Sequence, residues 1–169
     1  KTPLRMPLRI RVPYWATRGG TVKLNGRELE SFAEPTSYYV LNRTWQDGDK
    51  VEITMPMSLH IHPMPDNDTI QAAMYGPLVL TGRLGLEGLT KERMRAEPTA
   101  IRQVPEYKST PVPAPEIKTA SHTPLGWIEP IPGRSLEFRT VGQAQNITLV
   151  PFYKLLDERY VVYWRVSRA

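Results

Sequence analysis

Hydrophobic and polar residues alternate along the first third of the chain. In residues 8–12, Leu8, Ile10 and Val12 alternate with two arginines, so the apolar side chains share one face of an extended segment. Later segments repeat this period of two, at 21–24 and at 51–55. A strand with one apolar and one polar face is typical of an antiparallel sheet that covers a core on one side.

Dipeptides that favour tight turns separate these segments. They are Gly19-Gly20, Asn25-Gly26 and Asp47-Gly48. Glycine and asparagine tolerate the positive φ that short hairpin loops require. Short strands joined by such turns predict an all-β fold, and we expect a mostly antiparallel, jelly-roll-like β-sandwich with little helix. The run PLVLTG at 77–82 lacks the alternation and predicts a strand buried on both faces.

The character of the sequence changes near residue 85. Eight of the 17 prolines lie between Glu97 and Pro132, and proline holds the backbone extended without donating to a strand. We therefore expect three segments: the main sandwich strands in 1–84, a proline-rich strap or linker in 85–134, and strands in 135–169 that complete or extend the sandwich. Within the strap, the run LTKERMRAE beginning at Leu89 has a helical pattern.

Strand patterns resume in the last segment of the chain. They are expected at 135–140, 146–150 and 160–166. The last of these carries bulky side chains on both faces, including Tyr163 and Trp164, so we expect both of its faces to be covered.

Cysteine is absent from all 169 residues. Its absence removes thiol nucleophiles, disulfides and thiolate metal ligands from this chain. No run of eighteen apolar residues is present, so the sequence predicts no membrane-spanning helix, and no basic-then-apolar leader is visible. The chain opens on Lys1 in a strand-like pattern, which favours a piece of a longer protein.

The net charge of the chain is +5, and residues 1–27 hold seven basic residues and no acidic one. Clustered basic residues are typical of nucleic-acid-binding surfaces. Here Arg9 and Arg11 alternate with apolar residues, which makes them the solvated face of a strand, and no nucleic-acid-binding motif accompanies them. We expect neither nucleic acid nor a membrane as a partner.

A metal site is one interpretation of the sequence HIHPMPDND. His60 and His62 project from one face of a strand, and Asp66 and Asp68 follow, so imidazole and carboxylate ligands could gather there. The histidines equally fit the polar face of an alternating strand, and Asp-Asn-Asp after proline is typical of a turn. We favour the second interpretation and expect no metal site. The third histidine, His122, lies in the strap.

Asp157 and Glu158 form a pair of carboxylates near aromatic residues, the combination that glycoside hydrolysis uses. Consecutive residues on a strand project to opposite faces, which does not place two carboxylates across one sugar bond. In a turn they form a charged tip, with Arg159 beside them to pair. We favour the turn and expect no catalytic residue in this chain.

Aromatic side chains offer another candidate site, because exposed rings bind sugars by stacking or contact a neighbouring domain. The candidates for carbohydrate or interdomain contact are Trp127, Phe152, Tyr153 and Tyr160, and Trp15 is a further ring that could join a sugar-stacking surface. Aromatic residues on strands also fill cores and interfaces, so both interpretations stay open.

Two groups of motifs run in order along the chain. The first group is LRIRVPYWA (8–16), VKLNGRE (22–28), RTWQDGDKVEITMPM (43–57) and AAMYGPLVLTG (72–82), and the second is WIEPIPGRSLEFRT (127–140) and TLVPFYKLLDERYVVYW (148–164). Together they resemble the C-terminal part of the β-L-arabinofuranosidase-type glycoside hydrolases, which include families 127 and 146 and were long catalogued as a bacterial domain of unknown function. The motifs cover most of the chain outside the strap.

The resemblance implies that chemistry and support lie in different parts of the parent protein. Members of that family use an (α/α)₆ barrel in which zinc holds a cysteine thiolate nucleophile, with glutamates as ligand and acid/base. None of these residues can be carried onto a cysteine-free chain, so no cofactor is expected in it.

We therefore expect a non-catalytic accessory β-sandwich that packs on an upstream barrel of the same polypeptide. The parent would be bacterial, and secreted or periplasmic. The alternative is a carbohydrate-binding module for oligosaccharides of arabinose-containing plant polysaccharides.

Overall fold

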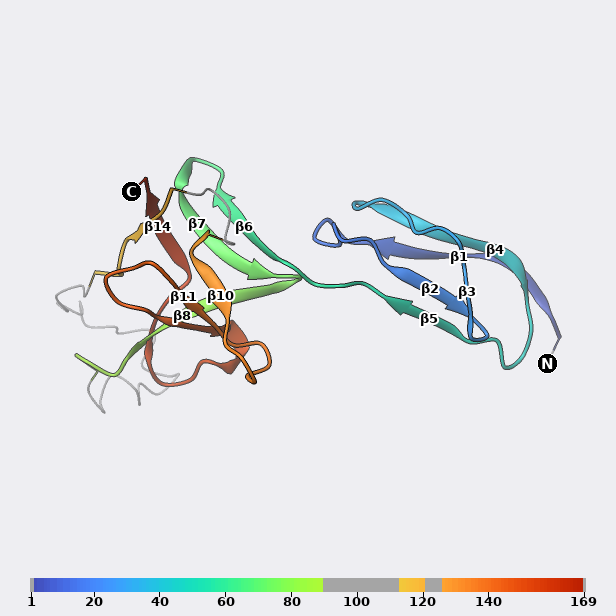
Figure 1. Ribbon diagram of the computed structural model, residues 1–169. Helices are drawn as coiled ribbons and strands as arrows, with labels where there is room; N and C mark the ends of the chain where they lie inside the picture. Colours follow the sequence, from blue (N-terminus) through green and yellow to red (C-terminus); the bar gives the residue numbers. More distant parts are fainter. Residues whose placement is uncertain (1, 90–112, 121–125, 169) are drawn as a thin grey trace, which may run out of the picture. The chain divides into compact units, whose positions relative to one another are not determined.

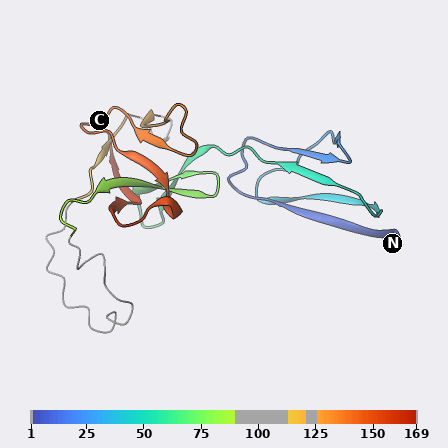
Figure 2. The same ribbon diagram turned by 90° about the horizontal axis from the view of Figure 1, so that it is seen from below.

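The computed structural model describes residues 2–89, 113–120 and 126–168 (Figures 1 and 2). The chain falls into two compact units. The first unit comprises Lys1–His60 and Tyr75–Pro77, and the second comprises Ile61–Met74 and Leu78–Ala169. Each unit has its own sheets and its own buried side chains.

The first unit contains a two-stranded and a three-stranded antiparallel sheet in its described residues. The two-stranded sheet pairs β1 (Leu4–Val12) with β4 (Ser37–Trp45), and the other has the order β3-β2-β5, from β2 (Thr21–Leu24), β3 (Arg27–Glu28) and β5 (Val51–Thr54). Asn25 and Gly26 both have positive φ in the loop between β2 and β3, as the hairpin prediction requires.

The core of the first unit follows the alternation of the sequence. Val12, Val22 and Leu41 are buried, whereas Arg9 and Arg11 are exposed. Cross-strand pairing keeps apolar residues opposite one another on the inner face of β1 and β4, since Leu8 pairs with Leu41. The predicted strands at 8–12 and 21–24 are therefore present with the predicted faces. The strand predicted at 51–55 is present as β5 over 51–54, but Ile53 of its expected inner face is 37% exposed.

The hairpin loop at Asn25 is tied to the turn that follows β4. The Asn25 side chain donates to Asp49 Oδ1 and accepts from the Lys50 amide, each at 2.8 Å. The other carboxylate oxygen of Asp49 accepts from the Gln46 amide at 2.8 Å and lies 3.4 Å from Arg43 Nη2. The Asn-Gly and Gly-Asp motifs of the sequence thus form one network that holds β2 and β5 in register.

Among the described residues, nine strands form one sheet centred on the second unit. Its main order is β10-β11-β12-β8-β7-β14-β9, while β6 pairs with β7 and β13 with β8. The strands are β6 (Leu59–Met64), β7 (Asn67–Tyr75), β8 (Leu78–Gly85), β9 (Ile117–Lys118), β10 (Ile128–Pro130), β11 (Phe138–Thr140), β12 (Thr148–Pro151), β13 (Arg159–Val161) and β14 (Tyr163–Ser167), with a short 3₁₀ turn η3 (Phe152–Lys154). The pairs β10–β11, β11–β12, β12–β8, β13–β8 and β14–β7 are antiparallel, whereas β14 pairs with β9 in parallel.

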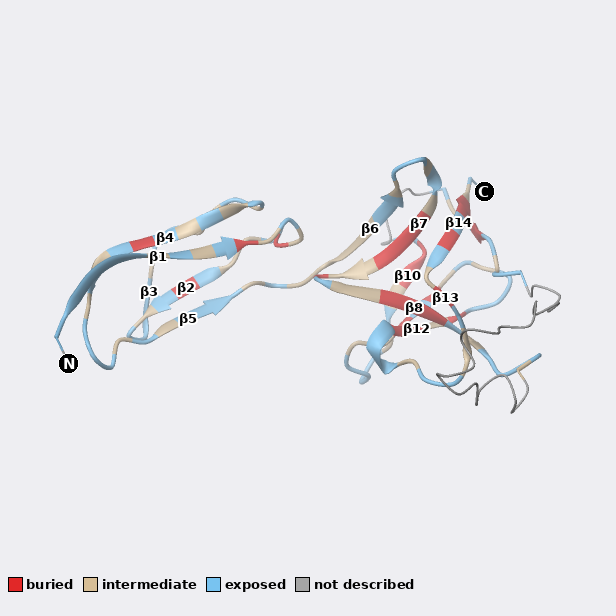
Figure 3. Cartoon of the chain, turned by 180° about the vertical axis from the view of Figure 1, so that it is seen from behind, coloured by how far each residue is buried: buried red, intermediate tan, exposed pale blue. Residues whose placement is uncertain are grey.

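Two tryptophans fill the centre of the second unit. Trp127 is 1% exposed and Trp164 is 0% exposed, and their rings meet edge to face with centroids 6.1 Å apart. Gly82 of β8 lies directly beneath the Trp164 ring, where a Cβ atom would overlap it. Figure 3 shows the buried residues along β7, β8 and β14.

The predicted all-β class is confirmed, and so is the strand at 77–82, whose residues Leu80, Thr81 and Gly82 are buried. The prediction of a single strand at 160–166, covered on both faces, is wrong in two respects. It is divided by a bend at Val162 into β13 and β14, and one face of β14 is exposed, including Tyr163 at 55%.

The proline-rich strap is described in part. Residues 113–120 and 126–134 contribute β9 and β10, and Ile117 is only 1% exposed. The rest of the strap lies outside the described residues, including His122 and most of the helical run that begins at Leu89. The structure groups residues 61–74 and 78–84 with the C-terminal strands, whereas the sequence pattern joins them to the segment 1–84.

Substitution of Gly82 tests how closely β8 and β14 approach. We expect Gly82→Ala to lower the free energy of unfolding by about 1–3 kcal/mol, because the added methyl group overpacks against the Trp164 ring. In a Trp164→Leu background the same substitution should cost clearly less, which urea denaturation of the four proteins measures. An equal cost in both backgrounds would show that the ring is not what excludes the methyl group.

A second prediction concerns Asp49. Its pKa is lowered below the ordinary 3.8, chiefly by the Asn25 side chain and then by the Gln46 amide. The interactions of the Asp49 carboxylate therefore stabilise the fold fully above the unfolded pKa of about 3.9. This stabilisation is lost as pH falls through the lower folded pKa.

Asp49→Asn should melt at a lower temperature than the wild type at pH 7, and the difference should shrink below about pH 4 as the wild-type carboxylate takes up its proton. Thermal melts across this pH range measure the difference. Glu52→Gln is a suitable control, because Glu52 is paired only with exposed Lys50 on β5. pH 2.5 is about one unit below the ordinary pKa of an aspartate. A difference in melting temperature between Asp49→Asn and the wild type that stays constant down to this pH would contradict the role of the carboxylate charge.

Candidate functional site

No group of three or more histidine, cysteine, aspartate or glutamate side chains that could hold a metal occurs in residues 2–89, 113–120 and 126–168. His60 is half-buried, its Nδ1 atom lies 3.3 Å from the Ser58 carbonyl, and its ring meets Tyr14 edge to face. His62 is exposed on the same strand, and the turn predicted at Asp66 joins β6 to β7. The described part of the chain also contains no helix long and apolar enough to cross a membrane.

The carboxylate pair lies in a bend that leads into β13. Asp157 is exposed and has a φ of 55°, while Glu158 accepts a hydrogen bond from Arg83 Nε of β8 at 2.6 Å. Arg159 points elsewhere, donating to the Leu84 carbonyl at 3.0 Å and lying 3.6 Å from Glu87. The expected pairing with Arg159 is wrong, since the cross-strand register brings Arg83 to the bend.

The four aromatic candidates divide into one buried and three exposed residues. Trp127 is enclosed in the core against Trp164, so its ring does not lie on a surface open to a sugar. Phe152, Tyr153 and Tyr160 are 49%, 64% and 52% exposed, and Phe152 meets Tyr160 edge to face with centroids 5.5 Å apart.

One further large apolar side chain is exposed between these rings in the sequence. Leu156 lies two residues beyond η3 and is 80% exposed. We call Phe152, Tyr153, Leu156 and Tyr160 the aromatic patch. Side chains of this size are normally covered in a folded protein, so a patch of them marks a surface for contact.

Two cavities lie in the second unit. The first, of about 420 Å³, is lined by Asp68, Thr69, Gln71, Glu116, Thr119, Arg165, Val166, Ser167 and Arg168, and we call it the β7–β14 cavity. The second, of about 560 Å³, is lined by residues of β8 and β13 with the loop before β12, and we call it the β8–β13 cavity. Its charged residues Arg83, Glu87, Glu158 and Arg159 are paired with one another.

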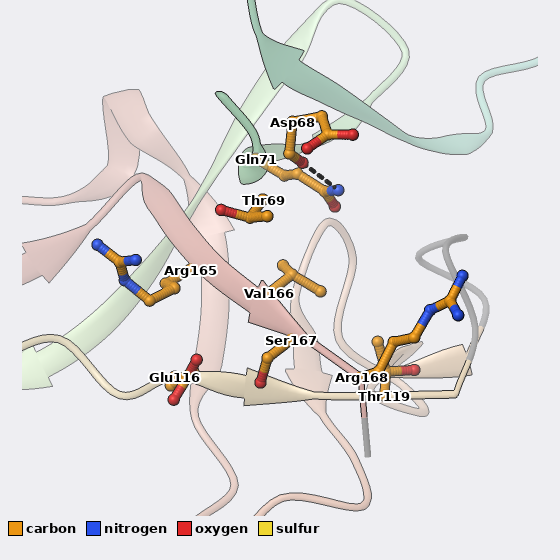
Figure 4. A pocket seen from close by; sticks show the side chains of 9 residues that line it. All are labelled: Asp68, Thr69, Gln71, Glu116, Thr119, Arg165, Val166, Ser167 and Arg168. Atoms are coloured by element: carbon orange, nitrogen blue, oxygen red, sulfur yellow. Dashed lines mark hydrogen bonds between the residues drawn. The ribbon is translucent and has the colours of Figure 1, made fainter. Parts of the chain in front are cut away.

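Three separate segments build the β7–β14 cavity (Figure 4). Asp68, Thr69 and Gln71 lie at the start of β7, the end of β14 supplies Ser167, and Glu116 directly precedes β9. The sequence pattern indicated Asp68 as a metal ligand or, preferably, a turn residue, and it gave no signal for the others. No local pattern could have found them, since only the pairing of β14 with β7 and β9 brings them together.

Two family models match the sequence of this chain. The model of the DUF4986 family, a domain of unknown function, matches residues 60–166. The chain belongs to the DUF4986 family. The model described as the GH127 middle domain of beta-L-arabinofuranosidase matches residues 1–57.

The limits of the two matches agree with the structure. The DUF4986 match begins at the residue where the first structural unit passes into the second, at His60. The predicted resemblance to β-L-arabinofuranosidase-type glycoside hydrolases is confirmed. No curated protein matches the sequence.

Solved structures share the fold of this DUF4986 chain. A glycoside hydrolase superposes with a TM-score of 0.54 at 18% identity, covering 97% of this chain and 28% of its own. A GH127 β-L-arabinofuranosidase from Geobacillus stearothermophilus T6 gives 0.56 at 16% identity, covering 99% and 27%, and another GH127 β-arabinofuranosidase gives 0.56 at 15%, covering 99% and 28%. The chain therefore spans less than a third of the length of these relatives.

The positive φ of Asp157 leads to a prediction that separates backbone from charge. Asp157→Asn should change the free energy of unfolding by no more than about 0.5 kcal/mol, because asparagine also tolerates the left-handed region and the side chain is exposed. Asp157→Val should cost about 1–2 kcal/mol, because a β-branched residue is strained there. Chemical denaturation measures both. Equal effects of the two substitutions would assign the role to the carboxylate instead of the backbone.

Proposed function

We propose that this chain is a non-catalytic accessory β domain of a glycoside hydrolase resembling β-L-arabinofuranosidases. Its role is to pack on the catalytic (α/α)₆ barrel of the same polypeptide and stabilise it. The observation that carries the proposal is the aromatic patch, an apolar surface on a chain that covers only 27–28% of related hydrolases.

The side chains of the aromatic patch are largely exposed. Phe152 and Tyr160 support each other by ring contact, but half of each side chain faces outward. Leu156 is 80% exposed, so the fold of this chain alone buries very little of its side chain. Covering an aliphatic or aromatic side chain of this size contributes about 1.5–3 kcal/mol. A neighbouring domain that covers the patch would therefore be held to it firmly.

The reacting groups that the resemblance implies for the barrel are a second reason for an accessory role. The resemblance implies a zinc-held cysteine thiolate in the barrel, and this chain has no cysteine at any of its 169 positions. Asp157 and Glu158 do not replace that machinery, because Glu158 is paired with Arg83 while Asp157 is held in an exposed bend. The chain therefore contributes support instead of reacting groups, and zinc would be bound outside it.

Binding of plant oligosaccharides by stacking on aromatic rings is the weaker candidate. It needs a flat platform of exposed rings, and Trp127 is enclosed in the core. Phe152 and Tyr160 meet at an interplanar angle of 60°, so the two rings do not form a single plane. An origin in a bacterial enzyme that is secreted or periplasmic belongs to the same proposal.

Substitution of the aromatic patch in the full-length parent enzyme tests the packing role. Tyr153→Ser combined with Leu156→Ser should lower the melting temperature of the parent enzyme by several degrees, because about 1.5–3 kcal/mol of burial is lost for each side chain. The same pair of substitutions in this chain alone should change its melting little, since both side chains are already exposed there.

Tyr163→Ser is a matched control, because Tyr163 is 55% exposed on β14 and lies outside the aromatic patch. It should leave the melting of the parent enzyme within about one degree of wild type. If the patch substitutions have the same small effect in the parent enzyme and in this chain, the patch is not a packing surface and the proposal fails.

A further inference from the structure

The β7–β14 cavity differs from the β8–β13 cavity in the pairing of its charged groups. Asp68, Glu116 and Arg165 form no ion pair within residues 2–89, 113–120 and 126–168. In the β8–β13 cavity, by contrast, Arg83 is bound to Glu158 and Arg159 lies near Glu87. The charged groups of the second cavity are paired with one another, while Asp68, Glu116 and Arg165 of the first form no ion pair within the described residues and remain available to a ligand.

The amide of Gln71 adds a buried acceptor to this cavity. Gln71 is only 7% exposed, and its Nε2 donates to the Asp68 carbonyl at 2.8 Å. That bond requires a donor, so it fixes which end of the amide is nitrogen. Oε1 is left buried with no hydrogen-bond partner among the residues that the structure describes. An orphaned acceptor of this kind destabilises a fold unless a donor reaches it.

The composition of the lining indicates which kind of ligand fits. Acidic and basic residues are equal in number, with Asp68 and Glu116 against Arg165 and Arg168, so the cavity has no excess charge to select an ion. Hydroxyl groups of Thr69, Thr119 and Ser167 complete the lining. Such a set accepts and donates hydrogen bonds in several directions, as neighbouring hydroxyl groups of one ligand require. Its volume of about 420 Å³ falls in the usual range for small-molecule sites.

We infer that the β7–β14 cavity binds an uncharged, polyhydroxylated ligand of the size of one or two sugar residues. Asp68, Glu116 and Gln71 Oε1 accept hydrogen bonds from its hydroxyl groups, and Arg165 and Ser167 donate to its oxygens. No aromatic ring is among the described residues that line the cavity, so recognition is by hydrogen bonding and not by stacking. This inference is independent of the packing role, because the cavity shares no residue with the aromatic patch.

A divalent cation is the less suitable occupant. In the described lining, the cavity supplies two carboxylates, and two guanidinium groups line the same space. Calcium requires six to eight oxygen ligands, usually including several carboxylates, and nearby positive charge opposes its binding.

Calorimetric titration of the 169-residue chain with L-arabinose, D-xylose and D-galactose tests the inference. At least one of the three sugars should bind with a Kd of about 1 mM or lower. Asp68→Ala with Glu116→Ala should weaken that binding about tenfold or more, as expected for the loss of two hydrogen-bonding groups. The matched control is Glu87→Ala, which removes a carboxylate from the β8–β13 cavity and should leave binding unchanged.

Gln71→Met separates binding from stability. Binding should weaken about tenfold, whereas the melting temperature should change little, because the substitution removes an unpartnered acceptor together with one hydrogen bond. The inference is overturned if none of the three sugars binds, if the Asp68→Ala, Glu116→Ala variant binds as well as wild type, or if glycine or calcium binds at the cavity in place of the sugars.

Discussion

The close approach of β8 and β14 through Gly82 and Trp164 is the constraint on which the second unit depends. A glycine on β8 leaves room for the indole ring, and the ring in turn closes over Trp127 from the segment before β10. Three segments far apart in sequence therefore share one packing point. Because β7 lies between β8 and β14 in the strand order, the same contact fixes the part of the sheet that carries the β7–β14 cavity.

Much of the fold can be predicted from local patterns. Alternation identifies β1, β2 and β5, because a strand with one wet face repeats every two residues. Asn25-Gly26 identifies a hairpin, because both residues must adopt positive φ. The bend at Val162 could not be predicted in this way. Apolar residues occupy both sides of the break, so the sequence pattern runs through it unchanged.

The candidate site depends on contacts between distant residues. Glu158 is paired with Arg83 across 75 positions and not with its neighbour Arg159, because the bulge where β13 pairs with β8 decides which guanidinium reaches the bend. Trp127 could not be distinguished from an exposed ring in sequence, since its burial depends on β14. Most residues of the β7–β14 cavity are ordinary polar residues, and only the pairing of β14 with both β7 and β9 gathers them.

The tip of the β7–β8 hairpin has a topological consequence. Tyr75–Pro77 belongs to the first unit although both strands of the hairpin run through the second, and the Gly76 amide donates to the Ser58 carbonyl at 3.0 Å. The chain therefore passes between the units three times. A single cut near residue 58 separates the two family matches in sequence but removes Tyr75–Pro77 from the first unit. The first unit is therefore discontinuous in sequence, and a fragment that ends at the boundary between the two matches lacks one of its segments.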